Sequence, residues 1–518
     1  MTSSISRRLV LQSMGAASLL GGLGLSTRAA MAQSTSLRAA ITGYSVINTL
    51  DPAQATLIPE YYVMWSTFNG LMKFDADMKL VPDLAESYSP IETGGFEFKL
   101  RPGVKFHNGE VLSSEDVKFS FERVMSPDLA SPNASKLSEV SKIETPDPLT
   151  VRIHTKAPYA PLLTFLSNSR TGTQIINKKA FEEMGADAFS RAPVGTGAYK
   201  VKEWNAGEGL TLEAHPEYFE GAPSFAKIEV PLIAEEASGV TALKGGQIDM
   251  TSTVPAADVA QLMKDDSVTL LRQPGLNTRF ISINLTKAPF DDIHFRRAIS
   301  MAFQREAIVQ AVLFGEGVAA DGIIPPQLAE YQSGTTRKYM TYNPEAAKAE
   351  LAKSKYKPDE MEVPVITWGG GWWKRFAEIF VAQVNQVLGT KLTVEVTDAN
   401  AAYARQKSGD FVAGVWGWLG MVDPDEYVGG LLTSTGWRNF QGYSNAQVDE
   451  LAAKGAAETD PAKRPEFYKQ AEDIAMDEVA LIPCFFSNIS NLLRPGIEGF
   501  DQKAYSNYGD QFYKMKEA

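Results

Sequence analysis

Tryptophan is the residue type in this chain whose placement most suggests a binding chemistry. Six of the eight tryptophans lie within one window of 70 residues, from position 368 to position 437. An indole offers a flat apolar face and one N–H donor, which suits the binding of small amphipathic ligands. Packing in a hydrophobic core is the alternative. The residues that we assign to a candidate ligand site are Trp368, Trp372, Trp373, Trp416 and Trp418.

Polar residues near predicted strand ends supply the other candidates. Tyr44, Asn48, Thr49 and Asn277 could reach a ligand, although loop or packing roles are the alternative for each. Asp423 could hold a cationic group of the ligand. The alternative for Asp423 is a helix N-cap, since the proline that follows it is typical of a first helical turn.

Patterns for catalysis or metal binding are absent from the sequence. The histidines at positions 107, 154, 215 and 294 are far apart, and the single cysteine, Cys484, leaves no zinc-binding spacing and no intrachain disulfide. We find no G-x-S-x-G, no H-E-x-x-H, and no S-x-x-K in a suitable context. The sequence therefore predicts no catalytic residue, no metal site and no cofactor.

Composition places the chain among ordinary soluble globular proteins. It has 518 residues, of which 44% are hydrophobic and 22% charged. These values exclude disorder, coiled coil and collagen, and the length predicts about three structural units. The net charge of −12, without a basic run, argues against binding to nucleic acid or to an anionic membrane.

Residues 1–32 have the pattern of an export signal. Arg7 and Arg8 precede a mildly apolar stretch over 9–25, and Ala30-Met31-Ala32 fits a cleavage site. The arginine pair favours twin-arginine export; an ordinary secretory signal and an N-terminal membrane anchor are the alternatives. No cysteine follows the signal, so we expect a product without a lipid anchor, located in the periplasm.

Strands and helices are predicted to alternate along the remaining chain. Apolar–polar alternation predicts strands over 96–100, 151–155 and 281–285. Helical spacing predicts one long helix over 293–314 and another over 376–388, ended by Gly389. Capping patterns at Ser113 and Asn343 predict two further helix starts. A long mixed α/β chain of this kind favours two lobes with a ligand site between them.

One segment gives the sequence a specific likeness. Residues 98–110, which read FKLRPGVKFHNGE, closely resemble the family-5 solute-binding proteins of ABC importers, a family that includes dipeptide-, oligopeptide- and nickel-binding proteins. The resemblance continues in family order over about 450 residues. The further matching segments are 194–199, 243–249, 295–299, 423–425 and 443–449.

The resemblance implies an α/β, two-lobed periplasmic binding protein fold with an inserted subdomain in lobe I and a two-strand hinge. Lobe I would comprise residues 33–285 with the insertion at about 60–190, lobe II residues 286–484, and residues 485–518 would return to lobe I. The hinge strands would lie near 281–285 and 481–486. The implied role is that of a monomeric, non-catalytic receptor which delivers a small solute to an inner-membrane permease and its ATPase subunits.

Two ligand anchors of the family are expected to be absent. Peptide-binding relatives hold the ligand ammonium with an aspartate just after a Gly-Trp pair, where the resemblance gives this chain either Met421 or a gap. Dipeptide binders hold the carboxylate with an arginine ahead of the helix that here begins near Lys374, and residues 367–373 contain none. A peptide remains the leading ligand class. The alternatives are an opine-like conjugate, a sugar or a chelated metal, and, as other functions, an exported hydrolase or a sensor-linked receptor.

Overall fold

A computed structural model describes residues 36–369 and 372–518. The predicted export signal, as well as Gly370 and Gly371, lies outside the described residues. Within them, the largest sheet has twelve strands, and its main path is β16-β15-β17-β13-β18-β11-β1-β10-β9-β8. β12 and β14 also pair with β18. The strands are β1 (Leu37–Thr42), β8 (Tyr199–Asn205), β9 (Gly209–Ala214), β10 (Lys227–Ile233), β11 (Met250–Thr251), β12 (Thr269–Pro274), β13 (Asn277–Ile283), β14 (Gly317–Ala319), β15 (Glu362–Trp368), β16 (Lys391–Thr397), β17 (Ala413–Leu419) and β18 (Ile482–Leu493).

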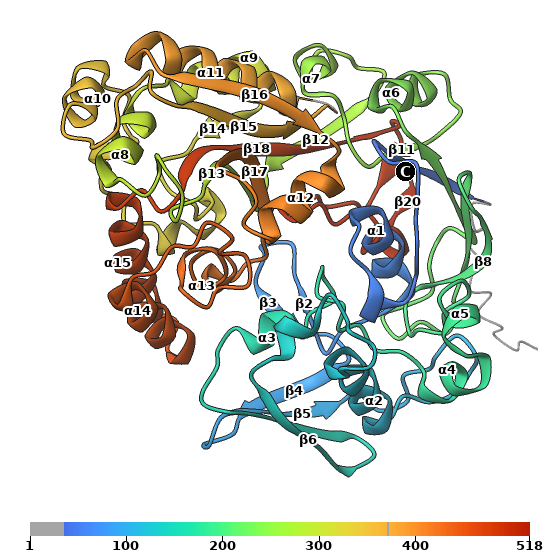
Figure 1. The fold of residues 1–518 in the computed structure, drawn as a ribbon. Coiled ribbons are helices and arrows are strands. Elements are labelled where there is room, and N and C mark those ends of the chain that lie inside the picture. Colours follow the sequence, from blue (N-terminus) through green and yellow to red (C-terminus); the bar gives the residue numbers. More distant parts are fainter. Residues whose placement is uncertain (1–35, 370–371) are drawn as a thin grey trace, which may run out of the picture. The chain divides into compact units, whose positions relative to one another are not determined.

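The long strand β18 joins the two halves of this sheet. Near its start, Ile482 pairs with Ile281 of β13, and at its end Leu493 pairs with Met250 of β11. Figure 1 shows β18 crossing the molecule from the region of β13 and β17 toward β11 and the C-terminus. One strand therefore runs from one hydrophobic core into another.

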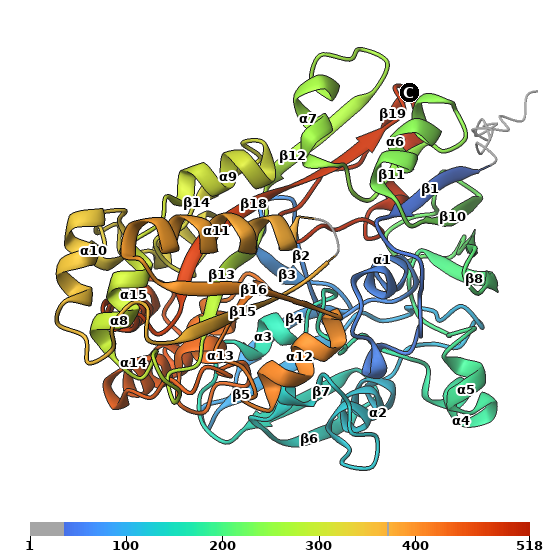
Figure 2. The same cartoon turned by 45° about the horizontal axis from the view of Figure 1, so that its top comes forward.

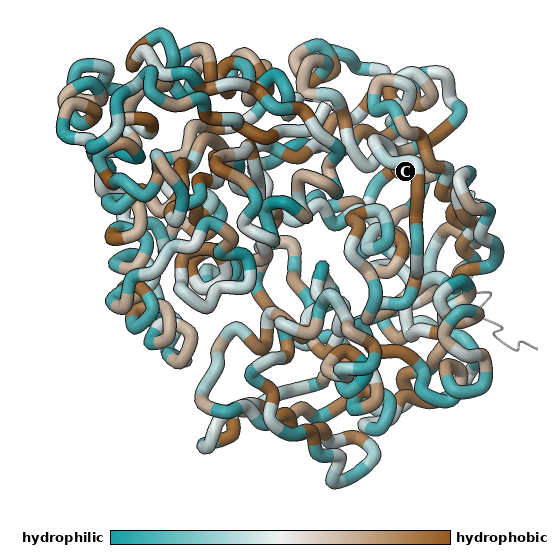
Figure 3. Tube along the Cα trace, viewed as in Figure 1, coloured by the Kyte–Doolittle hydropathy of each residue, from teal (hydrophilic) through white to brown (hydrophobic). Residues whose placement is uncertain are grey.

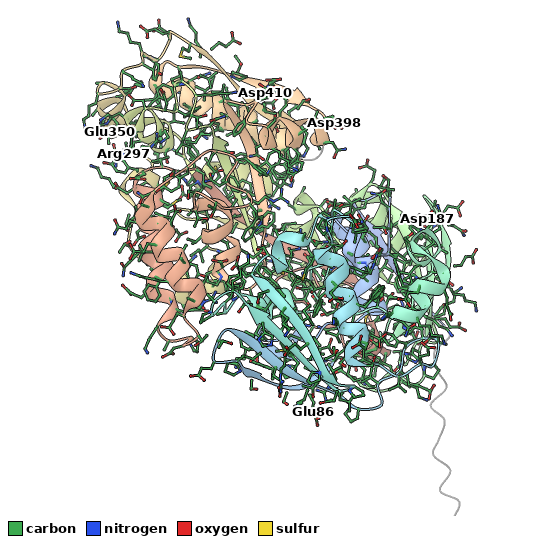
Figure 4. The ribbon with its side chains drawn as sticks, turned by 60° about the horizontal axis from the view of Figure 1, so that its bottom comes forward. Glu86, Asp187, Arg297, Glu350, Asp398 and Asp410 are labelled. Carbon is green, nitrogen blue, oxygen red and sulfur yellow. The ribbon has the colours of Figure 1, made fainter. Side chains whose placement is uncertain are left out.

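Three buried cores account for most of the apolar interior. Core A contains residues between 276 and 485 together with Ala504. Core B contains residues between 37 and 230, Met250, and residues between 493 and 515. Core C contains residues between 53 and 175. In Figure 4, Glu350, Arg297, Asp398 and Asp410 mark the part around core A, and Glu86 and Asp187 mark the part around cores B and C.

Core C lies under a separate four-stranded antiparallel sheet and helix α2. The sheet order is β4 (Ala85–Pro90), β5 (Gly95–Leu100), β7 (Thr150–Thr155) and β6 (Val140–Asp147). Helix α2 (Ser114–Met125) begins with the predicted capping box, in which the backbone N–H of Ser113 donates to Asp116 Oδ2 at 3.0 Å. Val117, Phe121 and Val124 are buried, which confirms the apolar face read from their spacing.

The remaining helices cover the large sheet and flank the cores (Figure 2). Figure 3 shows long hydrophobic stretches along the strands and hydrophilic ones in peripheral turns. None of the helices in the described residues is long and apolar enough to span a membrane. They are α1 (Ile58–Thr67), α3 (Leu162–Phe165), α4 (Lys178–Met184), α5 (Ala186–Phe189), α6 (Glu236–Lys244), α7 (Ala256–Leu262), α8 (Ile293–Met301), α9 (Arg305–Leu313), α10 (Pro344–Leu351), α11 (Trp373–Leu388), α12 (Ala399–Lys407), α13 (Val428–Leu432), α14 (Ala446–Ala457) and α15 (Arg464–Asp477).

Two predicted helix ends are confirmed, and one predicted helix is wrong. The Asn343 side chain accepts from the N–H of Ala346 at the start of α10, and Gly389 ends α11 with a φ of 70°. The single helix predicted over 293–314 is instead α8 and α9, separated at residues 302–304. At the break, the N–H of Gln304 donates to the side chain of Gln383 at 2.7 Å instead of continuing the helical ladder.

Candidate functional site

A central pocket lies between residues of core A and residues of core B. It encloses a volume of about 30 Å³. Strand ends of β13 and β17 form one wall, and α1 together with the C-terminal segment forms another. Pockets at junctions of this kind are where small ligands usually bind. The lining includes Ile58, Phe74, Arg170, Asn277, Met421 and Tyr505.

Four of the predicted tryptophans form one aromatic cluster beside β17. Trp372 stacks on Trp373 with ring centroids 4.1 Å apart, and Trp373 lies 4.3 Å from Trp368. Trp368 in turn meets Trp416 edge-on at 5.2 Å. Each of the four rings is half-buried. The cluster thus retains accessible aromatic surface, which a buried core would not.

Trp418 lies apart from this cluster. The guanidinium of Arg438 is 4.9 Å from its ring centroid, and its indole Nε1 is buried without a hydrogen-bond partner among the described residues. Arg438 also donates to the hydroxyl of Tyr403 at 2.8 Å, and Tyr403 stacks on Trp416. Trp418 is therefore half-buried, and its indole N–H donates no hydrogen bond to any described residue.

Strand β13 brings Arg279 to the aromatic cluster. Its guanidinium lies 5.6 Å and 5.4 Å from the rings of Trp372 and Trp373. In the antiparallel pair with β17, Arg279 is opposite Gly417, where an added Cβ would come within 2.7 Å of Arg279 Cδ and Nη1. Glycine at 417 therefore leaves the room that the guanidinium occupies. Because alternate residues of a strand share a face, Arg279 lies on the same side of β13 as Asn277 of the central pocket.

Arg170 enters the central pocket from the other side. Its Nη1 donates to the backbone oxygen of Leu419 at 2.9 Å, and it carries a buried Nε without a partner among the described residues. Nearby, Lys136 Nζ donates to the Arg170 backbone oxygen at 2.6 Å. Burial lowers the pKa of Lys136 to about 7 and raises the pKa of Glu426, which faces Lys136, Arg170 and Arg438.

The carboxylate of Asp423 is used inside the fold. Its oxygens accept from Nη1 and Nη2 of Arg464 at 2.8 and 2.7 Å, and Oδ1 also caps the short 3-10 helix at Pro424–Glu426 through the N–H of Asp425 at 2.9 Å. Both side chains are almost fully buried. The geometry matches the capping alternative, and the ligand role of Asp423 stays a prediction.

The four polar candidates are scattered. Tyr44 is half-buried, and burial raises its pKa while the charges of Arg170 and Arg279 oppose that shift, which places it near both arginines. Both polar atoms of the Asn277 amide bond to Ser487. Nδ2 donates to the Ser487 backbone oxygen at 2.8 Å, and Oδ1 accepts from the N–H and the hydroxyl of Ser487 at 2.9 Å.

Asn48 and Thr49 lie away from the aromatic cluster. Asn48 is exposed and lines a separate open pocket beside β8, while Thr49 Oγ1 accepts from the N–H of Asp51. Tyr44 and Asn277 therefore lie near the two arginines, whereas Asn48 and Thr49 do not.

The structure places an arginine from another part of the chain beside the tryptophans. The segment before α11 indeed lacks an arginine, but β13 supplies Arg279 to the same tryptophans from elsewhere in the chain. At the position of the family aspartate, Met421 lines the central pocket, and its sulfur accepts from the Ser169 hydroxyl at 3.2 Å. Sequence reasoning missed Arg279, although a lone charged residue in an otherwise uncharged strand was a visible signal. Arg170, in a loop, gave none.

No group of three or more His, Cys, Asp or Glu side chains that could hold a metal ion occurs in residues 36–369 and 372–518. Cys484 is fully buried, and burial raises the pKa of its thiol to about 12. The central pocket offers the guanidinium of Arg170 and the aromatic rings of Phe74 and Tyr505, and Arg279 with the aromatic cluster lies along β13 beyond Asn277; these groups are means of holding a ligand.

Comparison with known proteins agrees with this picture. Residues 79–439 match the family model described as bacterial extracellular solute-binding proteins, family 5 Middle. The glutathione-binding protein GsiB of Escherichia coli is 29% identical over 468 residues, covering 88% of this chain and 90% of that protein.

Solved structures share the fold over nearly the whole chain. The binding protein AgaA of A. tumefaciens R10, in complex with agropinic acid, has a TM-score of 0.81 at 27% identity, with 93% and 99% of the two chains covered. The periplasmic binding protein DppA of Helicobacter pylori, in complex with the peptide STSA, has a TM-score of 0.83 at 23% identity, with 94% and 99% covered. The predicted α/β periplasmic binding protein fold is thereby confirmed, and this chain belongs to the bacterial extracellular solute-binding proteins of family 5.

Proposed function

We propose that this protein captures a short peptide in the central pocket and delivers it to an ABC permease in the inner membrane. The observation that carries the proposal is the pocket itself, placed between cores A and B and flanked by the aromatic cluster and by two arginines. Half-buried tryptophans suit the side chains of a peptide, and guanidinium groups suit its carboxylate. The relatives named for glutathione and for a bound peptide favour this ligand class.

An opine-like conjugate is the second candidate ligand. A relative bound to agropinic acid, at 27% identity, favours it. A conjugate of this kind also carries carboxylates, so the same pocket would serve both classes.

Two lobes around the pocket would provide capture by closure. Core A corresponds to the proposed lobe II, and cores B and C to lobe I with its insertion. The hinge strands would lie near 281–285 and 481–486, where Ile281 of β13 pairs with Ile482 of β18. Hydrogen bonds such as Ala160 N–H to the Ala456 oxygen at 2.8 Å already link the two sides.

The proposal also covers the export of the protein and its role as a receptor that performs no catalysis. Residues 1–32 would direct twin-arginine export and be removed near Ala32, which leaves a monomeric periplasmic protein without a lipid anchor. The described residues that line the pocket, among them Arg170, Asn277 and Tyr505, form no nucleophile–base pair, so they give a hydrolytic function no support. Transport of the captured ligand would require an inner-membrane permease and its ATPase subunits.

Thermal shift and calorimetry against a ligand panel test the proposal. The panel holds di- to pentapeptides, glutathione, opines, sugars and chelated nickel. A ligand at 100 times its dissociation constant stabilises the folded state by about 2.7 kcal/mol. We expect this shift with peptides. A shift with opines alone would replace the ligand class, and binding of none of them would refute the proposed function.

A further inference from the structure

Arg279 is a charged side chain that the described part of the fold leaves unpaired. No carboxylate of the described residues lies within 4.0 Å of it, and its Nε is buried without a partner. Its one hydrogen bond runs from Nη1 to the backbone oxygen of Thr278 at a long 3.3 Å. By comparison, the buried guanidinium of Arg464 has a bidentate carboxylate and that of Arg305 donates to three backbone oxygens. Arg279 is thus held in place without being satisfied.

The surroundings of Arg279 add positive charge instead of cancelling it. Burial lowers its pKa to about 10, and the charge of Arg170 acts in the same direction while Tyr44 opposes both. Glu426 is the acidic group that faces Arg170, and it is shared with Lys136 and Arg438. A second anion between Arg170 and Arg279 would therefore be attracted.

The geometry prepares Arg279 for a planar anion. Gly417 opposite it removes the side chain that would displace the guanidinium, and Trp372 and Trp373 lie against it on another side. A guanidinium held in this way can give two parallel N–H···O bonds to a carboxylate. Arg279 is half-buried. A partly desolvated charge without a partner is costly, so an anion bound beside it would compensate that charge.

We propose that Arg279, flanked by Arg170, is the carboxylate-binding subsite of the central pocket, and that the ligand class is therefore anionic. This inference rests on the proposed function and narrows it to ligands with a free carboxylate. It also explains how the chain can dispense with the arginine ahead of α11: the cation comes from β13, and reaches the tryptophans across the sheet.

Calorimetry on pairs of ligands that differ only in that carboxylate tests the subsite. The probes are glutathione and trialanine, each with its C-terminal amide, and mannopinic and agropinic acids as non-peptide carboxylates. We expect amidation to weaken binding to the wild-type chain about 10- to 100-fold. In Arg279→Gln, acid and amide should bind alike. Arg152→Gln, which removes a 44% exposed side chain on β7 that pairs with Glu97, is the matched control and should retain the wild-type preference.

The melting temperature of the ligand-free Arg279→Gln chain provides a second test that does not depend on the choice of ligands. Because the guanidinium of Arg279 is unpaired, Arg279→Gln should leave the melting temperature of the ligand-free chain unchanged or raise it. Three results would each overturn the subsite. The wild type could bind acid and amide with equal affinity, or Arg279→Gln could retain the preference for the acid. The third is a marked fall in the ligand-free melting temperature of Arg279→Gln.

The outcomes also separate this inference from the proposed function. Binding of a non-peptide carboxylate, lost in Arg279→Gln, would keep the subsite and refute the peptide class. Tight peptide binding that ignores the carboxylate would keep the proposed function and overturn the subsite. If no probe binds, the proposed function fails, and the melting temperature of Arg279→Gln decides the subsite alone.

Discussion

Replacing Asp423 by asparagine separates a structural role from a ligand role at that position. Asparagine keeps the side-chain oxygen that caps the N–H of Asp425, but it removes the negative charge opposite Arg464. The two side chains are only 5% and 9% exposed. Asp423 and Tyr468 help to hold the pKa of Arg464 above its usual range although burial opposes this, so the guanidinium stays charged after the substitution.

The expected cost follows from that burial. Breaking a buried ion pair by removing one partner costs about 3–5 kcal/mol, since the other charge is left uncompensated. An unfolding entropy of about 2.1 cal/mol/K per residue gives roughly 1 kcal/mol/K for a chain of about 480 residues, if it unfolds as one unit. Asp423→Asn should therefore lower the melting temperature by about 3–5 °C. Asp423→Ala, which also loses the cap, should cost about 1 kcal/mol more.

Calorimetric melting and peptide titration of the same samples check this reasoning. The control is Glu450→Gln, which removes an exposed helical pair with Lys454 and should leave the melting temperature unchanged within error. Peptide affinity of Asp423→Asn should equal that of the wild type. A melting temperature within 1 °C of the wild type, combined with a tenfold loss of affinity, would show that the carboxylate serves the ligand instead of the fold.

Three further changes test other parts of the structure. Burial raises the pKa of Asp425 to about 7, so the folded chain holds its proton more tightly than the unfolded chain between about pH 4 and pH 7. The stability that this group contributes is thus full below pH 4 and is lost as the pH rises to about 7. Urea midpoints measured from pH 5 to pH 8 should therefore fall less steeply for Asp425→Asn than for the wild type. Wild-type and variant midpoints that fall in parallel would contradict this prediction. Gly417→Ala would place a Cβ 2.7 Å from Arg279 Cδ, so carboxylate ligands should bind about tenfold more weakly by calorimetry, an unchanged affinity arguing against the contact. Trp373→Leu should abolish most of the ligand-induced change in tryptophan fluorescence, whereas Trp204→Leu on β8 should preserve it; equal responses would place the ligand elsewhere.

Helix ends with local signals could be predicted from the sequence, because the interacting groups are a few residues apart. The Ser113 capping box, the Asn343 cap and the terminal Gly389 all act within one turn of the backbone. The family likeness in residues 98–110 likewise needed no coordinates. The break inside the predicted helix 293–314 could not be read in this way. It exists because Arg305 turns inward to donate to the oxygens of Pro483 and Met340, residues remote in sequence.

The same distinction between local sequence signals and tertiary contacts applies to the candidate site. Sequence alone determined that tryptophans gather in one window and that an export signal pattern precedes a solute-binding chain, since both are properties of residue order. Tertiary structure decided which cation meets those tryptophans, because the register of β13 against β17 sets Arg279 opposite Gly417, 138 positions further along the chain. Tertiary packing also pairs Asp423 with Arg464 and places Arg170 at the central pocket. Strand register and the packing between cores are set by contacts summed over many distant residues, which no local pattern encodes.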